Sequence, residues 1–215
     1  MSIDRMEKSI EVDVVDRIAD ELVERYAKIL APEIVRETVS AAYEEISRTA
    51  RVRTFLPTLA GRYADDQIKA KAIANGLMES DEPRVVFVCP SNTGRSQIAA
   101  ALLARKSGGK ITVRSGAGVR PGGHLHHLAV EALQEQGIDL SDLFPKKFTS
   151  DAHQAAEYIV TMDCSDEIDH LADKNYISWD IPTLANKPMK EVREIIALIE
   201  QKTDDLLNRL SVDTA

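Results

Sequence analysis

One stretch constrains the fold of this 215-residue chain more than any other. Apolar residues at positions 85–88 lead into Cys89, a short polar loop follows, and a run rich in alanine and leucine begins at Arg95. β-Branched and aromatic residues favour strands, whereas alanine and leucine favour helices, so the stretch predicts a strand, a loop and a helix. Such a loop directs its backbone N–H groups and the first turn of the helix towards one small volume. The stretch therefore predicts a site for an anion.

The ends of this reactive loop (residues 89–95) carry the groups needed to attack an oxyanion. Cys89 opens the loop, and Arg95 closes it six positions later. A thiol that faces converging N–H groups and a guanidinium should ionise readily, and the planar guanidinium can bind two oxygens of a tetrahedral anion. A cation in the first turn of a helix opposes the helix dipole, which suggests that a bound anion compensates Arg95. The loop thus predicts thiolate attack on phosphate, or on its close mimic arsenate.

After the loop, strands and helices are expected to alternate. Strands are expected at residues 84–88, 110–115 and 157–162. Helices are expected at residues 95–106, about 126–136 and 190–210. This alternation is typical of a parallel sheet with helices on both faces. The reactive loop follows the first strand, at the edge where open α/β sheets bind ligands.

The N-terminal third of the chain has a purely helical pattern. Apolar residues recur at helical spacing from residue 10 to about residue 30. Pro32, at a favoured first-turn position, begins a second helical stretch. After a break at residues 54–57, a third helix is expected from about residue 59 to residue 74. Three such helices with short connections predict a small bundle.

A polar, proline-containing segment at residues 78–84 separates the two patterns. We therefore predict a three-helix bundle at residues 1–80 and an α/β catalytic domain at residues 81–215.

Composition narrows the class of partner and the compartment. The formal net charge of −8 disfavours nucleic acid, because binding to the phosphate backbone depends on clustered Lys and Arg. No apolar run approaches the ~20 residues of a membrane span, and residues 1–8 lack the apolar core of a signal peptide. Two cysteines form no disulfide framework. We therefore expect a cytoplasmic protein without a membrane partner.

Five ordered blocks resemble the low-molecular-weight protein tyrosine phosphatases and the arsenate reductases built on the same fold. The blocks are Cys-x5-Arg-Ser at residues 89–96 and the segments at residues 113–118, 129–140, 159–164 and 179–182. The helical N-terminal extension resembles that of some actinobacterial arsenate reductases. The resemblance implies an α/β, parallel-sheet phosphatase-like domain preceded by a small α-helical bundle.

The resemblance also implies roles for residues of the loop. Cys89 is the expected nucleophile, Arg95 holds the oxyanion, and the Ser96 hydroxyl stabilises the thiolate. The expected oxyanion-binding residues are Ser91, Asn92, Thr93, Gly94 and Arg95. By residue type, Asn92 should adopt a positive φ, and Gly94 should allow the backbone to approach the oxyanion closely.

Cys164 has two interpretations. In the thiol-coupled arsenate reductases, the first cysteine of the matching block attacks the nucleophile's adduct, and a second cysteine close by completes a relay. Here Ile168 follows Cys164 at the four-residue spacing, so a three-cysteine relay is excluded. Cys164 either resolves the adduct through a Cys89–Cys164 disulfide or is a passive buried cysteine.

The general acid of the phosphatases has no clear counterpart. Thr183 stands where the phosphatases carry an aspartic acid, and a threonine hydroxyl cannot act as a general acid near neutral pH. Asp180 either substitutes for that acid or anchors its loop.

The histidines do not predict a metal site. His124, His126 and His127 lie together, but no Cys, Asp or Glu accompanies them at ligand spacing. A loop or helix start is the expected setting, and neither a metal nor a cofactor is implied.

Three functions remain open. The first is an arsenate reductase serving arsenic detoxification, with electrons from thioredoxin or from mycothiol and mycoredoxin. The second is a phosphomonoesterase acting on phosphotyrosine through a Cys89 phosphocysteine. The third is a catalytically impaired homologue that only binds oxyanions. We favour the first, because reduction of arsenate depends less on protonating an organic leaving group.

Overall fold

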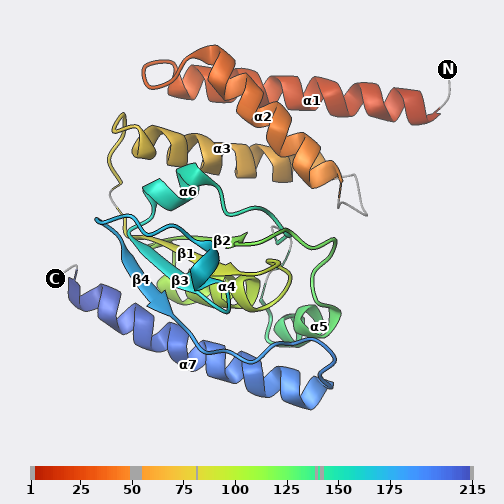
Figure 1. Cartoon of the computed structure of the whole chain (residues 1–215). Coiled ribbons are helices and arrows are strands. Elements are labelled where there is room, and N and C mark those ends of the chain that lie inside the picture. Colours follow the sequence, from red (N-terminus) through yellow and green to blue (C-terminus); the bar gives the residue numbers. More distant parts are fainter. Residues whose placement is uncertain (1–2, 49–54, 81, 139, 141–142, 214–215) are drawn as a thin grey trace. The chain divides into compact units, whose positions relative to one another are not determined.

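The computed structural model describes residues 3–48, 55–80, 82–138, 140 and 143–213 (Figure 1). Parts of the predicted bundle (residues 1–2 and 49–54), residue 81 of the predicted boundary and residue 139 of the block at residues 129–140 lie outside the described residues. The chain divides into two compact units, Met1–Glu79 and Ser80–Ala215.

The unit at residues 80–215 is built on a four-stranded parallel sheet. Its strands are β1 (Arg84–Cys89), β2 (Thr112–Ala117), β3 (Tyr158–Thr161) and β4 (Asn175–Ser178). They lie in the order β2-β1-β3-β4, and every adjacent pair is parallel. The predicted fold class is confirmed. Every residue of β1 is buried, as expected of a central strand covered on both faces.

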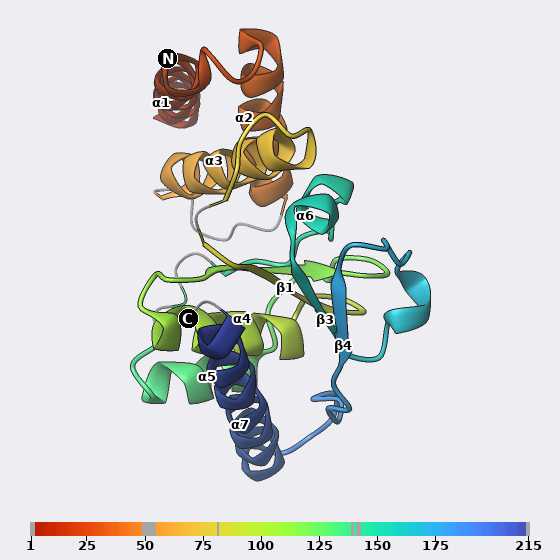
Figure 2. The ribbon, with the colours of Figure 1, turned by 90° about the vertical axis from the view of Figure 1, so that its left-hand side faces the viewer.

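Helices cover both faces of this sheet. They are α4 (Arg95–Ser107), α5 (His127–Glu135), α6 (Ser150–Ala155) and α7 (Met189–Asp213), and a single 3₁₀ turn, η1, spans Ser165–Glu167. Figure 2 shows α4, α5 and α7 on one face of the sheet and α6 on the other. The core on the α4 side includes Phe87, Ile98, Leu103, Val160 and Ile199.

The boundaries of three predicted elements were wrong. The first helix, expected from residue 10 to about residue 30, is α1 (Ile3–Tyr26), and it ends early because a turn follows in which the N–H groups of Ile29 and Leu30 donate to the carbonyl of Tyr26. The strand expected at residues 110–115 is β2, at 112–117, because Gly108 and Gly109 adopt positive φ and residue 110 still belongs to their turn. The third helix, α3 (Leu56–Ala74), begins before the expected residue 59. Pro57 lies in its first turn, where proline is tolerated, so it does not break the helix.

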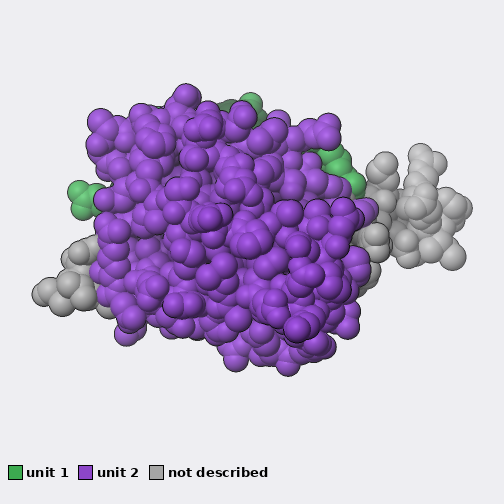
Figure 3. Space-filling view, turned by 60° about the horizontal axis from the view of Figure 1, so that its bottom comes forward, with its two compact units in different colours: residues 1–79 green, residues 80–215 purple. Residues whose placement is uncertain are grey.

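The other unit (green in Figure 3) contains α1 (Ile3–Tyr26), α2 (Pro32–Ser47) and α3. The three helices bury one another's apolar stripes, which include Leu22, Val35, Val39, Ile46, Ala64 and Ile68. As predicted, Pro32 opens the second helix.

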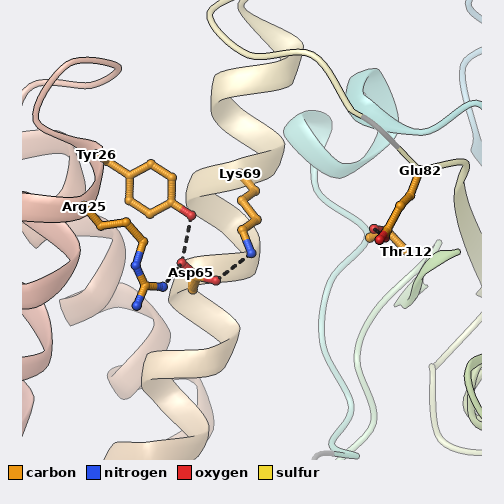
Figure 4. A network of polar contacts seen from close by, with 6 residues as sticks. All are labelled: Arg25, Tyr26, Asp65, Lys69, Glu82 and Thr112. Carbon is orange, nitrogen blue, oxygen red and sulfur yellow. Dashed lines mark hydrogen bonds and ion pairs between the residues drawn. The ribbon is translucent and has the colours of Figure 1, made fainter. Parts of the chain in front are cut away.

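Asp65 on α3 joins α1 to α3 through a polar network (Figure 4). Its carboxylate accepts a 3.0 Å hydrogen bond from Arg25 and a 2.8 Å hydrogen bond from the hydroxyl of Tyr26, and it pairs with Lys69 at 2.9 Å. Burial acts to raise the pKa of Asp65, but these three partners outweigh it and lower the pKa. Burial and Asp65 raise the pKa of Tyr26. In the unit that starts at residue 80, the carboxylate of Glu82 accepts a hydrogen bond from Thr112 at 3.2 Å (Figure 4).

None of the described helices combines the length and the apolar character that a bilayer span requires.

Candidate active site

Cys89 is the last residue of β1 and lies between the ends of the two neighbouring strands. Strand register pairs Cys89 with Ala117 of β2 and the preceding residue, Val88, with Thr161 of β3. The side chain is buried, and Sγ lies 3.0 Å from Oγ of Ser96. This places the thiol at the central carboxyl edge of the sheet, as the sequence predicted.

A second contact of Ser96 favours one direction for its hydroxyl proton. Nδ2 of Asn92 donates a 2.8 Å hydrogen bond to Oγ of Ser96. Because that oxygen already accepts a hydrogen bond, its own proton can be directed at the sulfur of Cys89.

The backbone of the reactive loop holds a row of unused donors. Within the part of the chain that the structure describes, no backbone N–H group from Ser91 to Ser96 donates a hydrogen bond to another group of the protein. The first turn of a helix leaves its N–H groups without intrahelical acceptors, and here the preceding loop adds more. Consecutive free N–H groups at a helix N-terminus form an anion-binding concavity.

Asn92 braces this loop from inside. It adopts the predicted positive φ, 53°, and its side chain is fully buried. Its Oδ1 accepts hydrogen bonds from Nε2 of Gln97 at 2.9 Å and from the backbone N–H of Lys146 at 3.0 Å. Nε2 of Gln97 also donates to the carbonyl of Phe144 at 2.7 Å. No local pattern predicted a role for Gln97, because its contact with Phe144 joins residues 47 positions apart.

Gly94 lies against a segment that the sequence did not place near the loop. A Cβ added at Gly94 would lie 2.5 Å from Cδ1 of Leu184, a buried residue of the segment between β4 and α7. The absence of a side chain at position 94 therefore lets this segment pack against the reactive loop.

Arg95 uses one edge of its guanidinium for the protein and leaves the other unused. Its Nη1 donates to Oδ2 of Asp163 and to the carbonyl of Ile181, the latter at 2.7 Å. For Nε and Nη2, the described residues offer no acceptor. The anion that compensates Arg95 in this structure is the carboxylate of Asp163, which the sequence analysis missed.

The segment after β3 that carries Asp163 also carries Cys164. Its side chain is buried, and both cysteines are free thiols. Burial raises the pKa of Cys164, and a charge on the neighbouring Cys89 raises it further, against a hydrogen bond to the backbone of Met162 and the charge of Arg95.

Gly118 lies against both cysteines. Its N–H donates a 3.0 Å hydrogen bond to the carbonyl of Cys89, and a Cβ added to it would lie 3.2 Å from Sγ of Cys164. The structure thus brings the two thiols into one region of the protein.

The segment at residues 118–126 runs beside the reactive loop and is hydrogen-bonded to it. The N–H of Gly122 donates to the carbonyl of Ser91 at 2.9 Å, and the N–H of His126 donates to the carbonyl of Thr93 at 2.8 Å. The hydroxyls of Ser91 and Thr93 lie 3.0 Å apart. These bonds use the carbonyl groups of the loop and leave its N–H groups unused.

The two residues in doubt as general acids are both exposed. Oγ1 of Thr183 accepts a 3.3 Å hydrogen bond from the N–H of Ala185. Asp180 makes no side-chain hydrogen bond or ion pair within the described residues, so it does not anchor its loop by such a contact. The loop is held instead by Trp179, whose buried ring packs 5.4 Å from the ring of Phe87, and by the carbonyl of Ile181.

His126 is the N-cap residue of α5 and is half-buried, whereas His124 and His127 are exposed. Burial and the neighbouring His127 lower the pKa of His126, against a hydrogen bond to the backbone of Leu184. In the described part of the chain, no group of three or more His, Cys, Asp or Glu residues could hold a metal ion.

Comparison with protein families identifies the class of protein that this fold and site define. A model of the family "Low molecular weight phosphotyrosine protein phosphatase" matches residues 84–215, which is more than half of the chain. A second model, "Protein-tyrosine-phosphatase-like, N-terminal domain", matches residues 15–72. The chain belongs to the low molecular weight phosphotyrosine protein phosphatase family.

The chain resembles both arsenate reductases and a phosphatase of this fold. The chain is 35% identical to the thioredoxin-dependent arsenate reductase Cg_ArsC1' of Corynebacterium glutamicum, with a TM-score of 0.79 and coverage of 94% of this chain and 98% of that one. It is 32% identical over 133 residues to a Halobacterium salinarum protein named "Putative arsenate reductase", covering 59% of this chain and 92% of the relative. It is 25% identical to the low molecular weight protein tyrosine phosphatase of T. tengcongensis, with a TM-score of 0.54 and coverage of 60% and 99%.

Proposed function

We propose that the protein is an arsenate reductase whose nucleophile is the Cys89 thiolate. The observation that carries this proposal is the row of unused N–H groups from Ser91 to Ser96, beside the thiol of Cys89 and the free edge of Arg95. Together they provide donors for a tetrahedral oxyanion next to a nucleophile. The choice of arsenate is supported by Cg_ArsC1', a named arsenate reductase that resembles this chain over nearly its whole length.

In the first step, the sulfur of Cys89 attacks the arsenic atom of arsenate. A sulfur–arsenic bond forms, and one arsenate oxygen takes up protons from solvent and leaves as water. The N–H groups of the loop and the Nε and Nη2 groups of Arg95 hold the remaining oxygens. Arsenic remains As(V) in this adduct.

In the second step, the thiolate of Cys164 attacks the sulfur of Cys89. A Cys89–Cys164 disulfide forms while the sulfur–arsenic bond breaks, and the electron pair of that bond stays on arsenic. The two thiols are oxidised by two electrons, As(V) is reduced to As(III), and arsenite leaves. The chain has no other cysteine, so a disulfide within one chain can join only these two residues.

The other residues of the loop support these steps. The hydroxyl of Ser96 donates to Cys89 and stabilises the thiolate. Asn92 orients that hydroxyl and fixes the loop, while Ser91, Thr93 and Gly94 contribute backbone donors.

The disulfide must then be reduced by an external dithiol of the thioredoxin type. The similarity to a relative that is named as thioredoxin-dependent supports thioredoxin itself. Mycothiol with mycoredoxin is the alternative electron donor, and it would act on the Cys89 adduct directly if Cys164 is passive. Either donor would place the protein in the cytoplasm.

A phosphomonoesterase acting through a Cys89 phosphocysteine is the second candidate. The family assignment favours it, because the same loop serves phosphate esters. Thr183 at the position expected for the general acid weighs against it, since a missing general acid typically costs about 10²–10⁴-fold in rate. A homologue that only binds oxyanions is the third candidate.

The test is arsenate-dependent consumption of NADPH, coupled separately to a thioredoxin system and to a mycothiol and mycoredoxin system. Hydrolysis of para-nitrophenyl phosphate is measured on the same preparation. We expect turnover with arsenate and thioredoxin, and none in the Cys89→Ser variant. Ester hydrolysis alone would establish the phosphomonoesterase instead, and inactivity in every assay would leave the oxyanion-binding homologue.

A further inference from the structure

Asp163 occupies a position that connects two parts of the site. It lies directly before Cys164 in the chain, and its backbone adopts a left-handed φ of 58°. Its carboxylate accepts a hydrogen bond from Nη1 of Arg95. The side chain of Asp163 is 56% exposed, whereas that of Arg95 is only 10% exposed. The ion pair therefore lies where the buried site meets solvent.

The first consequence concerns the orientation of Arg95. Both acceptors of its guanidinium, Asp163 and the carbonyl of Ile181, are bound by Nη1. Because the guanidinium is planar and rigid, fixing Nη1 also fixes the opposite edge, formed by Nε and Nη2. That edge is the one with no acceptor among the described residues.

The second consequence concerns Cys164. Its side chain is 4% exposed, and Gly118 approaches it so closely that an added Cβ would lie 3.2 Å from Sγ. Burial favours the neutral thiol, which is a poor nucleophile. A movement of the turn that carries Cys164 would relieve this burial, and the side chain of Asp163 ties that turn to Arg95.

We propose that Asp163 is a positioning residue that makes the reactivity of Cys164 depend on an oxyanion at Arg95. This inference rests on the proposed function of the site. An oxyanion on the Nε and Nη2 edge shares the positive charge of Arg95 with Asp163 and repels its carboxylate. A carboxylate that is half-exposed can move into water at little cost. Its release frees the Asp163–Cys164 turn, and Cys164 becomes reactive when there is an adduct to resolve.

The experiment uses the Cys89→Ser variant of the full chain, in which Cys164 is the only thiol. The rate of alkylation by iodoacetamide, an uncharged reagent, is measured with and without inorganic phosphate. Binding of phosphate to the same variant is measured separately by calorimetry. We expect saturating phosphate to raise the alkylation rate about fivefold, the effect on an equilibrium that a weak, partly exposed ion pair can have.

Adding Asp163→Asn removes the charge while keeping a residue that tolerates positive φ. This double variant should be alkylated about fivefold faster without phosphate, and phosphate should have no further effect, since the ion pair is already lost. Asp166→Asn, in the exposed turn that follows, is the matched control and should behave like Cys89→Ser alone. A general loosening of the fold would raise the rate of the double variant but would leave its response to phosphate intact.

Bound phosphate that leaves the alkylation rate unchanged, or lowers it, would overturn the coupling while leaving the oxyanion site in place. A response to phosphate that persists in the Asp163→Asn variant would overturn the role of Asp163. Absence of phosphate binding in calorimetry would overturn the oxyanion site itself, and the coupling with it.

Discussion

Cys89 and Arg95 lie at the two ends of one short loop, but the side chains of the two residues are contacted by different parts of the chain. The thiol of Cys89 is contacted by the hydroxyl of Ser96, at the start of the helix that follows the loop. Asn92, within the loop, donates a hydrogen bond to that hydroxyl. The guanidinium of Arg95 is held from outside, by the carboxylate of Asp163 and the carbonyl of Ile181. Changes within the loop should therefore act on the nucleophile, and changes in the later segments on the binding of the oxyanion.

Ser96→Ala removes the hydroxyl that can donate to Sγ of Cys89. We expect alkylation of Cys89 near neutral pH to be about 10- to 100-fold slower, because a hydrogen bond to a charged group is worth ~1.5–3 kcal/mol. The deficit should shrink as the pH rises, since the thiol then ionises without help. Measurement in the Cys164→Ser background isolates Cys89. A deficit of equal size at every pH would show that the hydroxyl does not act on the thiolate.

Cys164→Ser separates the two models of the reductant. If Cys164 resolves the adduct, turnover coupled to thioredoxin should disappear, because no disulfide within the chain can form. Turnover with mycothiol and mycoredoxin should then survive, since an external thiol resolves the adduct. Thioredoxin-coupled turnover that equals the unmodified chain's would identify Cys164 as a passive buried cysteine.

Different strands, and the segments that follow them, each contribute residues to the site. Strand β1 delivers Cys89, the segment after β3 delivers Asp163 and Cys164, and the segment between β4 and α7 delivers Ile181 and Leu184. The segment at residues 118–126 adds a layer of hydrogen bonds to the loop carbonyls. The site is thus assembled from four segments at one edge of a parallel sheet.

Thr183→Asp tests the loop before α7. If that position holds the missing general acid, the variant should hydrolyse para-nitrophenyl phosphate faster, by up to about 10²–10⁴-fold. Arsenate reduction should change little, because water rather than an alcohol or a phenol is released. Asp180→Asn is measured beside it, because a fall in ester hydrolysis in that variant would identify the exposed Asp180 as the substitute general acid. No gain in ester hydrolysis would mean that the loop does not present residue 183 to the substrate.

Sequence patterns predicted the elements whose residues repeat a strong local signal. β1, α4 and α7 carry long apolar or amphipathic patterns, and the positive φ of Asn92 follows from its residue type in a tight loop. β4 and α6 went unpredicted, because β4 is partly exposed and polar and α6 has only six residues. The contact of Arg95 with Asp163 joins residues 68 positions apart, so no local pattern could reveal it.

In the whole molecule, the histidines are distributed unevenly between the two compact units. All five histidines lie within residues 80–215. Burial lowers the pKa of His126 and of His153. We propose that residues 1–80 and 81–215 are separate domains, and this asymmetry allows the proposal to be tested by pH.

Acidification from about pH 7.5 to about pH 5.5 should lower the free energy of unfolding of the second domain only. Both histidines have a lower pKa in the folded chain than their ordinary value of 6.5. As the pH falls through that value, the unfolded state takes up protons that the folded state refuses, and stability is lost. Burial raises the pKa of Glu157 above its ordinary value of 4.5. This carboxyl therefore has the opposite effect: it lowers the free energy of unfolding as the pH rises above 4.5 and the carboxyl ionises.

Hydrogen exchange on the full chain measures this, after correction for the intrinsic effect of pH on exchange. Protection of amides in β1 and α4 should fall, while protection in α2 and α3 should stay constant. The double variant His126→Gln, His153→Gln should lose most of the effect. Equal loss of protection in both parts of the chain would contradict their independence.

The proposed mechanism requires Cys89 and Cys164 together to supply the two electrons that reduce arsenate. The most direct measurement is a single turnover: the fully reduced chain is mixed with excess arsenate and no external reductant, and arsenite and free thiols are counted. We predict one arsenite per chain, the loss of both thiols, and a Cys89–Cys164 disulfide in the peptide map. Absence of arsenite while both thiols survive would rule out this mechanism.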